Sequence, residues 1–243
     1  MRILESAQKR GIVIRALGGL GIRLSCEEST KPEFARTYND LDFIGRHEQS
    51  QAIRQLFDEM GYLPNKTFNA LHGRERLVFQ EPDGGGKIDV FLDRFRMCHT
   101  FDLEDRLTIC DKSLSPSDLF LTKIQIVEIT EKDLKDLICL VASKDVGFED
   151  NARVINIEHI AATCARDWGI YKTVTTNLSK ALEFLVQMPL TEGQKKEISS
   201  KAGKIMDLIE RKPKSLAWKA RARIGTRKQW YDHPEERERK IAS

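Results

Sequence analysis

Hydrophobic and polar positions in the first third of the chain follow patterns typical of short strands and turns. Residues 11–17 are rich in β-branched side chains and end at Gly18 and Gly19, which predicts a strand, a tight turn and then a short helix. Residues 25–39 have no periodicity and predict a loop, and residues 40–45 predict a second strand. Apolar residues at helical spacing from residue 50, stopped by a glycine at residue 61, predict an amphipathic helix.

A hairpin is predicted next, because two apolar segments, residues 75–80 and 87–93, flank a turn-rich stretch that contains three glycines. In the second segment alternation places Ile88, Val90 and Leu92 on one face and Asp89 on the other. We expect the apolar face to be buried, which leaves Asp89 on the opposite face.

From residue 115 onward the apolar spacing becomes helical. Predicted helices cover 115–127, 130–141, 151–168, 171–188, 192–212 and 215–231. The predicted fold class is α+β, a mixed sheet with flanking helices, followed by an all-helical C-terminal domain. We expect the two domains to cover residues 1–145 and 146–243.

Charge is unevenly distributed along the chain. The formal net charge is +3, but residues 195–228 hold twelve Lys or Arg against three Asp or Glu, which leaves the remainder acidic. A basic C-terminal part suggests a polyanionic partner. Five widely spaced cysteines, no long apolar run and no signal-like N-terminus favour a cytoplasmic protein with reduced thiols and no membrane segment.

Two carboxylates in the second predicted strand suggest metal-dependent chemistry. Asp40 and Asp42 are two residues apart, so in a strand they point to the same side and repel each other. A hard divalent cation relieves that repulsion, and Mg²⁺, with Mn²⁺ as an alternative, is the cofactor we expect. With Asp89 as a third ligand, such a site stabilises the attacking and leaving oxygens of a phosphoryl displacement.

Phosphate contacts are expected beside these carboxylates. The backbone N–H groups of Gly18 and Gly19 can approach phosphate oxygens closely, and Arg23 lies about one turn into the helix that follows. Together they predict a site for the triphosphate of an NTP.

This series of glycines and aspartates resembles the signature of the DNA polymerase β-like nucleotidyltransferase superfamily, and in particular its branch of abortive-infection toxins and related bacterial proteins. The resemblance covers roughly residues 11–142, and it implies that the α+β mixed sheet has the nucleotidyltransferase fold. It implies that Lys123 and Asp136 complete the pocket. The loop of residues 25–39 is longer than in compact members, so Arg36 is expected to be a substrate contact that replaces another.

The resemblance implies transfer of an NMP from an NTP to an acceptor hydroxyl, but three versions remain open. The acceptor is RNA, for example a tRNA end, bound by the basic C-terminal helices with their interleaved Trp218, Trp230 and Tyr231. Alternatively it is a small metabolite or antibiotic. In the third version the chain binds nucleotide without catalysis. The toxin-like version also allows an antitoxin partner.

Overall fold

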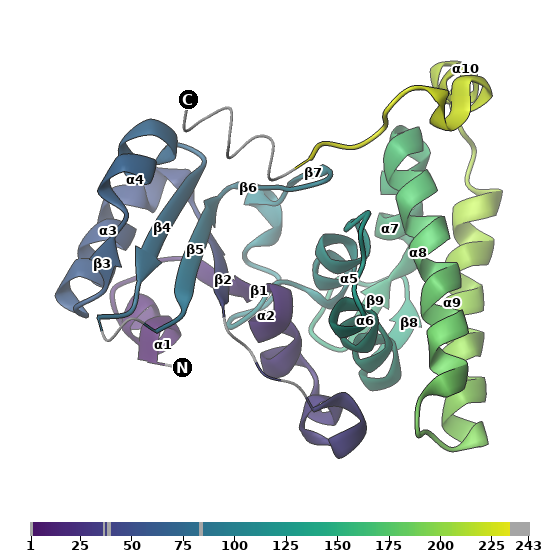
Figure 1. Ribbon diagram of the computed structural model, residues 1–243, viewed down its shortest axis with the longest axis horizontal. Helices are drawn as coiled ribbons and strands as arrows, with labels where there is room; N and C mark the ends of the chain where they lie inside the picture. Colours follow the sequence, from purple (N-terminus) through teal and green to yellow (C-terminus); the bar gives the residue numbers. More distant parts are fainter. Residues whose placement is uncertain (1, 36, 38–39, 83–84, 234–243) are drawn as a thin grey trace.

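A central mixed sheet organises the N-terminal half of the chain in a computed structural model that describes residues 2–35, 37, 40–82 and 85–233 (Figure 1). Within these residues the main order is β1-β2-β5-β4-β3; β2 and β5 are parallel and the other neighbours antiparallel, and the β6–β7 hairpin extends from β5. The strands are β1 (Ile14–Leu17), β2 (Leu41–Gly45), β3 (Leu63–Pro64), β4 (Arg76–Gln80), β5 (Lys87–Leu92), β6 (Arg94–Arg96) and β7 (Thr100–Asp102).

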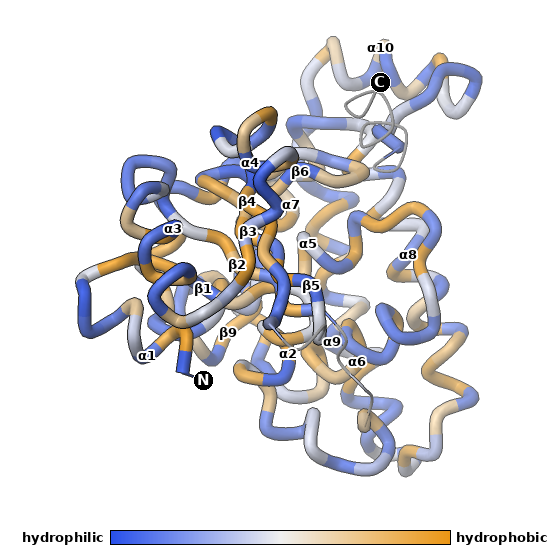
Figure 2. Tube along the Cα trace, turned by 60° about the vertical axis from the view of Figure 1, so that its left-hand side comes forward, coloured by the Kyte–Doolittle hydropathy of each residue, from blue (hydrophilic) through white to orange (hydrophobic). Residues whose placement is uncertain are grey.

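Helices cover both faces of this sheet. On one face α1 (Arg2–Lys9) and α3 (Ser50–Glu59) share an apolar cluster with the inward side chains of β1, β2, β4 and β5, and α4 (Lys66–His72) packs near β4. The opposite face carries α2 (Gly18–Ser25), α5 (Pro116–Ile124) and α6 (Glu131–Ser143). Figure 2 shows that hydrophilic residues lie on the helices, α9 among them, as well as in the turns and loops.

The C-terminal half is a group of packed helices, with a small sheet at its start. It contains β8 (Asp145–Gly147), β9 (Val154–Asn156), α7 (Ile157–Arg166), α8 (Trp168–Gln187), α9 (Glu192–Arg211) and α10 (Leu216–Ile224). One apolar cluster includes buried residues from both halves, such as Phe120, Leu137 and Leu178. The division at residue 145 therefore stays a prediction, since the two halves share packing across it.

Strand β5 is buried on both sides, which differs from the expectation for one of its faces. Ile88, Val90 and Leu92 pack into the α1–α3 cluster as expected, but Phe91, on the same face as Asp89, belongs to the second cluster. Asp89 is only 5% exposed as a result. A central strand with helices on both faces has no solvated side, so alternation alone overestimated the exposure of Asp89.

The α+β fold class is confirmed, with several local differences. The strands near 11–17, 40–45, 75–80 and 87–93 and the principal helices are present. The short helices α1 and α4 and the strands β3 and β6–β9 were not predicted, and the loop of residues 25–39 contains two 3₁₀ turns, Glu27–Thr30 and Pro32–Phe34. Such elements hold too few residues for a periodic signal and depend on their neighbours. No helix in the described part of the chain has the length and apolar character needed to cross a membrane.

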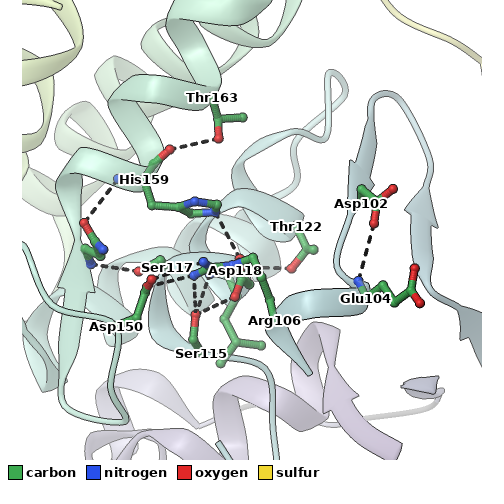
Figure 3. A network of polar contacts seen from close by, with 12 residues as sticks. Asp102, Glu104, Arg106, Ser115, Ser117, Asp118, Thr122, Asp150, His159 and Thr163 are labelled. Carbon is green, nitrogen blue, oxygen red and sulfur yellow. Dashed lines mark hydrogen bonds and ion pairs between the residues drawn. The ribbon is translucent and has the colours of Figure 1, made fainter. Parts of the chain in front are cut away.

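A buried ion network ties α5 to the rest of the molecule (Figure 3). The Asp118 side chain is fully buried in the first turn of α5, and its Oδ1 accepts from Arg106 Nε at 2.6 Å. Ser115 Oγ donates to Asp118 Oδ2 at 2.6 Å, and His159 Nε2 of α7 lies 3.2 Å from Asp118 Oδ1. Arg106 also pairs with Asp150 at 2.8 Å. Since each charged group has partners, the charges are compensated. The network holds α5 between the segment that contains Arg106 and helix α7.

We expect Asp118→Ala to lower the free energy of unfolding by about 3 kcal/mol, because it leaves the Arg106 guanidinium largely buried with one partner lost. Urea denaturation followed by circular dichroism measures this change. Asp105→Ala, at an exposed position in the same segment, is the matched control and should change stability by less than about 0.5 kcal/mol. Equal effects of the two substitutions would contradict a stabilising role for the network.

Candidate active site

Two aspartates meet on the α2–α5 face of the sheet. Asp42 of β2 and Asp89 of β5 are register partners on adjacent parallel strands, so their side chains point to the same side. They line a cavity of about 290 Å³ together with Leu17, Gly18, Asp40, Arg76, Lys87, Phe91, Phe95, Met97, Thr122, Lys123, Gln125, Ile126 and Asp133. Strand register therefore fixes the separation of the two carboxylates.

Gly18 makes room for one of these carboxylates. Its φ is +60°, a left-handed conformation that L side chains rarely adopt, and a Cβ at this position would collide with Asp42 Oδ2. Leu17, the preceding residue, is the register partner of Asp42 in β1. The strand-to-helix turn thus places the start of α2 directly against the Asp42 carboxylate.

The two carboxylates have different surroundings. Burial, followed by repulsion from Asp89, raises the pKa of Asp42 to about 6. Asp89 Oδ1 instead accepts from both Arg76 Nε and Arg76 Nη2 at 2.8 Å, and Lys87 Nζ lies 3.3 Å from Asp89 Oδ2. Asp89 therefore has cationic partners in direct contact, whereas the charge of the Asp42 carboxylate is the less well compensated of the two.

Lys123 forms a second charged cluster at the cavity wall. Its Nζ lies 2.9 Å from Asp133 Oδ1 and 2.9 Å from Asp136 Oδ2. Burial alone would lower the pKa of Lys123, but Asp136 and Asp133 together raise it, so the ammonium stays charged. Asp133 Oδ2 also accepts from Thr130 Oγ1 at 2.7 Å, so this residue caps α6 and holds Lys123 at once.

The donor chemistry fits a hard divalent cation that binds together with a nucleotide. Among the described residues, no three His, Cys, Asp or Glu side chains converge into a ready metal site. Mg²⁺, however, commonly uses one or two carboxylates and completes its coordination with substrate phosphates and water. Asp42 and Asp89 supply such a pair, and the raised pKa of Asp42 marks a carboxylate whose charge Lys123 and Arg76 compensate only in part.

The remaining predicted site residues are distributed unevenly. Asp40 lines the cavity but is exposed, just before β2. Gly19 is buried in the first turn of α2 and is not part of the cavity wall, and Asp136 reaches the site through Lys123. Arg23 points elsewhere, because its Nη1 donates to Ser29 Oγ at 3.2 Å. Arg36 lies outside the residues that the structure describes.

Sequence reasoning missed two cations of the site. Lys87 shares a strand face with Asp89 by simple alternation, so its position was a usable signal. Arg76 belongs to β4, where Val78 pairs with Asp89; only the register of the hairpin reveals that Arg76 lies diagonally across from it. Cavity residues just after β6 and α5, such as Met97 and Gln125, left no comparable pattern.

The basic C-terminal segment is engaged largely in contacts within the chain. Trp218 Nε1 donates to Cys164 O, and Trp230 Nε1 donates to Thr173 Oγ1. The Arg221 guanidinium lies 4.4 Å from the Trp168 ring centroid and donates to the carbonyl oxygens of Gly225 and Lys228. These contacts use the aromatic rings and Arg221 to attach the segment to α7 and α8, although Arg223 and Arg227 remain exposed.

No protein-family model and no curated protein sequence matches the chain. Two solved structures are similar in part: a lincosamide antibiotic adenylyltransferase with lincomycin bound, and the antibiotic-resistance factor ANT(2'')-Ia. The first is 16% identical, covers 57% of this chain and 92% of its own, and has a TM-score of 0.42. The second is 11% identical, covers 58% and 80%, and has a TM-score of 0.39. Likenesses of this size assign no function to the chain.

Gly18→Ala should lower the free energy of unfolding by about 1 to 3 kcal/mol, because the left-handed backbone and the Asp42 side chain both oppose a Cβ. Thermal or urea unfolding tests this. Gly203→Ala is the matched control, since α9 leaves open space at this glycine and alanine favours a helix by up to about 1 kcal/mol. A neutral effect at Gly18 would refute the close approach described above.

Stability should also depend on the protonation of Asp42. Because its folded pKa of about 6 exceeds the ordinary value near 4, the folded state binds the proton more tightly, and stability falls as pH rises from 4 through 6. We expect Asp42→Asn to raise the free energy of unfolding by about 2 kcal/mol at pH 8 and to have little effect below pH 4. Urea denaturation across this pH range measures it; a pH-independent difference would contradict the expectation.

Proposed function

We propose that this chain is a nucleotidyltransferase that moves an NMP from an NTP to an acceptor hydroxyl. The observation that carries the proposal is the Asp42–Asp89 pair, held in register on parallel strands beside the Gly18 turn. Two close carboxylates, one of them only partly compensated by nearby cations, are suited to a divalent cation and the phosphates it accompanies. The enzymatic activity and its assignment to the nucleotidyltransferase superfamily both belong to this proposal.

Each residue then has a distinct role. Asp42 and Asp89, with Asp40 at the exposed edge, would hold Mg²⁺ or Mn²⁺, which supplies charge stabilisation to the transferring phosphoryl group. Gly18 lets the N-terminus of α2, whose backbone N–H groups suit phosphate oxygens, lie against Asp42, and Lys123 contributes a buried positive charge to the same cavity. Gly19 and Arg23 are given no phosphate contact in this proposal, because Gly19 is buried in α2 and Arg23 donates to Ser29.

The transfer itself is an in-line displacement at the α-phosphorus. The acceptor oxygen forms a bond to phosphorus while the bond to the β-phosphate bridging oxygen breaks, and pyrophosphate leaves with the bonding electrons. The hydroxyl proton passes to a carboxylate of the Asp42–Asp89 pair. Positioning is the main contribution of the protein in this scheme, because the register of β2 and β5 sets where both carboxylates lie.

A small-molecule acceptor is the version we favour. Support comes from the C-terminal segment, where Arg221, Trp218 and Trp230 are already occupied by contacts within the chain. An RNA or tRNA acceptor, as in the toxin-like branch, would depend on the basic side chains of this segment that remain exposed, such as Arg223 and Arg227. That version, to which an antitoxin partner would belong, and the catalytically silent nucleotide binder are outcomes of the experiment below.

The test is incubation of the full chain with Mg²⁺ or Mn²⁺ and each α-labelled NTP, with total RNA or a small-molecule cell extract as acceptor. We expect label transfer to the extract and a loss of at least about hundredfold in Asp42→Asn. Asp145→Asn, at an exposed position on β8, is the matched control and should retain full activity.

The possible outcomes separate the versions. Label on RNA would replace the small-molecule acceptor by RNA and retain nucleotidyl transfer. NTP binding without any pyrophosphate release would identify a silent binder and overturn the proposal. Undiminished transfer by Asp42→Asn would also overturn it, because the carboxylate pair would then have no part in the reaction.

A further inference from the structure

A second cavity lies next to the carboxylate cavity. It has a volume of about 360 Å³ and is lined by His47, Phe68, His72, Arg74, Glu75, Arg76, Phe91, Leu92, Asp93, Arg94, Arg96, Met97 and Glu104. Arg76, Phe91 and Met97 line both cavities. A molecule in this second cavity is therefore separated from the Asp42–Asp89 pair only by side chains. The volume of the cavity is within the range of ordinary small-molecule sites.

The cavity has the form of a binding site. Phe68, Phe91, Leu92 and Met97 provide an apolar lining, and the His72 Nε2 atom is buried without a hydrogen-bond partner among the described residues. Asp93 is the one described non-glycine residue with a positive φ, 57°, and its Oδ1 accepts from the backbone N–H of His47 at 2.9 Å. Aspartate tolerates this conformation better than most residues, yet such positions often occur at functional sites.

The charges of the lining indicate which ligands it accepts. Arg96 pairs with Glu75, Arg94 with Asp102 and Arg76 with Asp89, so three of the four arginines are neutralised. Of the lining residues that have no ion pair within the described part of the chain, Arg74 is the one arginine, and Asp93 and Glu104 are the two carboxylates. Two uncompensated carboxylates against one guanidinium disfavour a polyanion and favour a neutral or cationic molecule.

We infer that this second cavity binds the acceptor, a neutral or cationic hydroxylated small molecule with an apolar face. This inference rests on the proposed nucleotidyl transfer and adds the location and the chemical class of the acceptor. The apolar lining holds the body of the molecule, Glu104 and Asp93 favour a positive group, and the hydroxyl points past Arg76 and Phe91 toward the carboxylate pair.

Three probes with the same phenol skeleton and different charges test the class: tyramine, a cation; tyrosol, neutral; and 4-hydroxyphenylacetate, an anion. Their dissociation constants for the full chain are measured by ligand-observed NMR, without any need for turnover. We expect tyramine and tyrosol to bind about two- to fivefold more tightly than 4-hydroxyphenylacetate, the range that partly exposed charges provide.

Charge-reversing variants locate the binding site. Glu104→Lys should remove the preference for tyramine over 4-hydroxyphenylacetate, and Arg74→Glu should increase it. Both side chains line the cavity and have no ion-pair partner among the described residues. Glu183→Lys, at an exposed position on α8, is the matched control and should leave all three constants unchanged. Absence of binding, an anion preference, or a preference that ignores both variants would overturn the inference.

The same variants separate this inference from the proposed function. If label transfer depends on Asp42 but the probes ignore Glu104 and Arg74, the enzyme stands and the acceptor lies elsewhere. If the probes bind in the expected charge order but no nucleotide is transferred, the cavity is a binding site for such molecules. The proposed nucleotidyl transfer is then wrong, and the bound molecule is not its acceptor.

Discussion

The site depends on one constraint, the parallel pairing of β2 with β5, which brings Asp42 and Asp89 side by side. Two carboxylates would separate if their side chains alone decided, because burial and mutual repulsion both disfavour their charges. The backbone hydrogen bonds of a central sheet, with apolar clusters on both faces, oppose that separation. The stability of the core is thus used to hold an electrostatically unfavourable arrangement in place.

Elements around the sheet act on the same pair. Gly18 allows the β1–α2 turn to approach Asp42, and Arg76 and Lys87 compensate the charge of Asp89. Helix α5, fixed at its first turn by the Asp118 network, carries Lys123 at its end into the cavity. The candidate chemistry is consequently difficult to separate from the fold in this molecule, because residues such as Gly18, Arg76 and Lys123 line the cavity and also stabilise the structure around it.

Much of the fold was predictable from sequence, because alternating and helical periodicities mark the long elements directly. Of the site, Asp42, Asp89 and Gly18 were predictable from strand and turn patterns. Arg76 was not, because its position depends on a hairpin register that local sequence does not encode. Arg23 shows the converse error: one helical turn from the glycines suggested proximity, but the direction of its side chain on α2 takes it to Ser29. The aromatic residues near the C-terminus were equally ambiguous, since a stacking surface and a packed anchor have the same composition.

The ion pairs of Asp89 have a consequence for how any cation reaches this site. Arg76 and Lys87 already occupy the oxygens that a metal ion would use, so loading the site is an exchange of one positive partner for another and not a simple addition. The affinity measured would be the difference between two pairings, which keeps it modest. The displaced guanidinium, held between the rings of Phe68 and Phe91, lies at the boundary with the second cavity. A ligand in one cavity would thereby change the surroundings of a ligand in the other, through the side chain of Arg76.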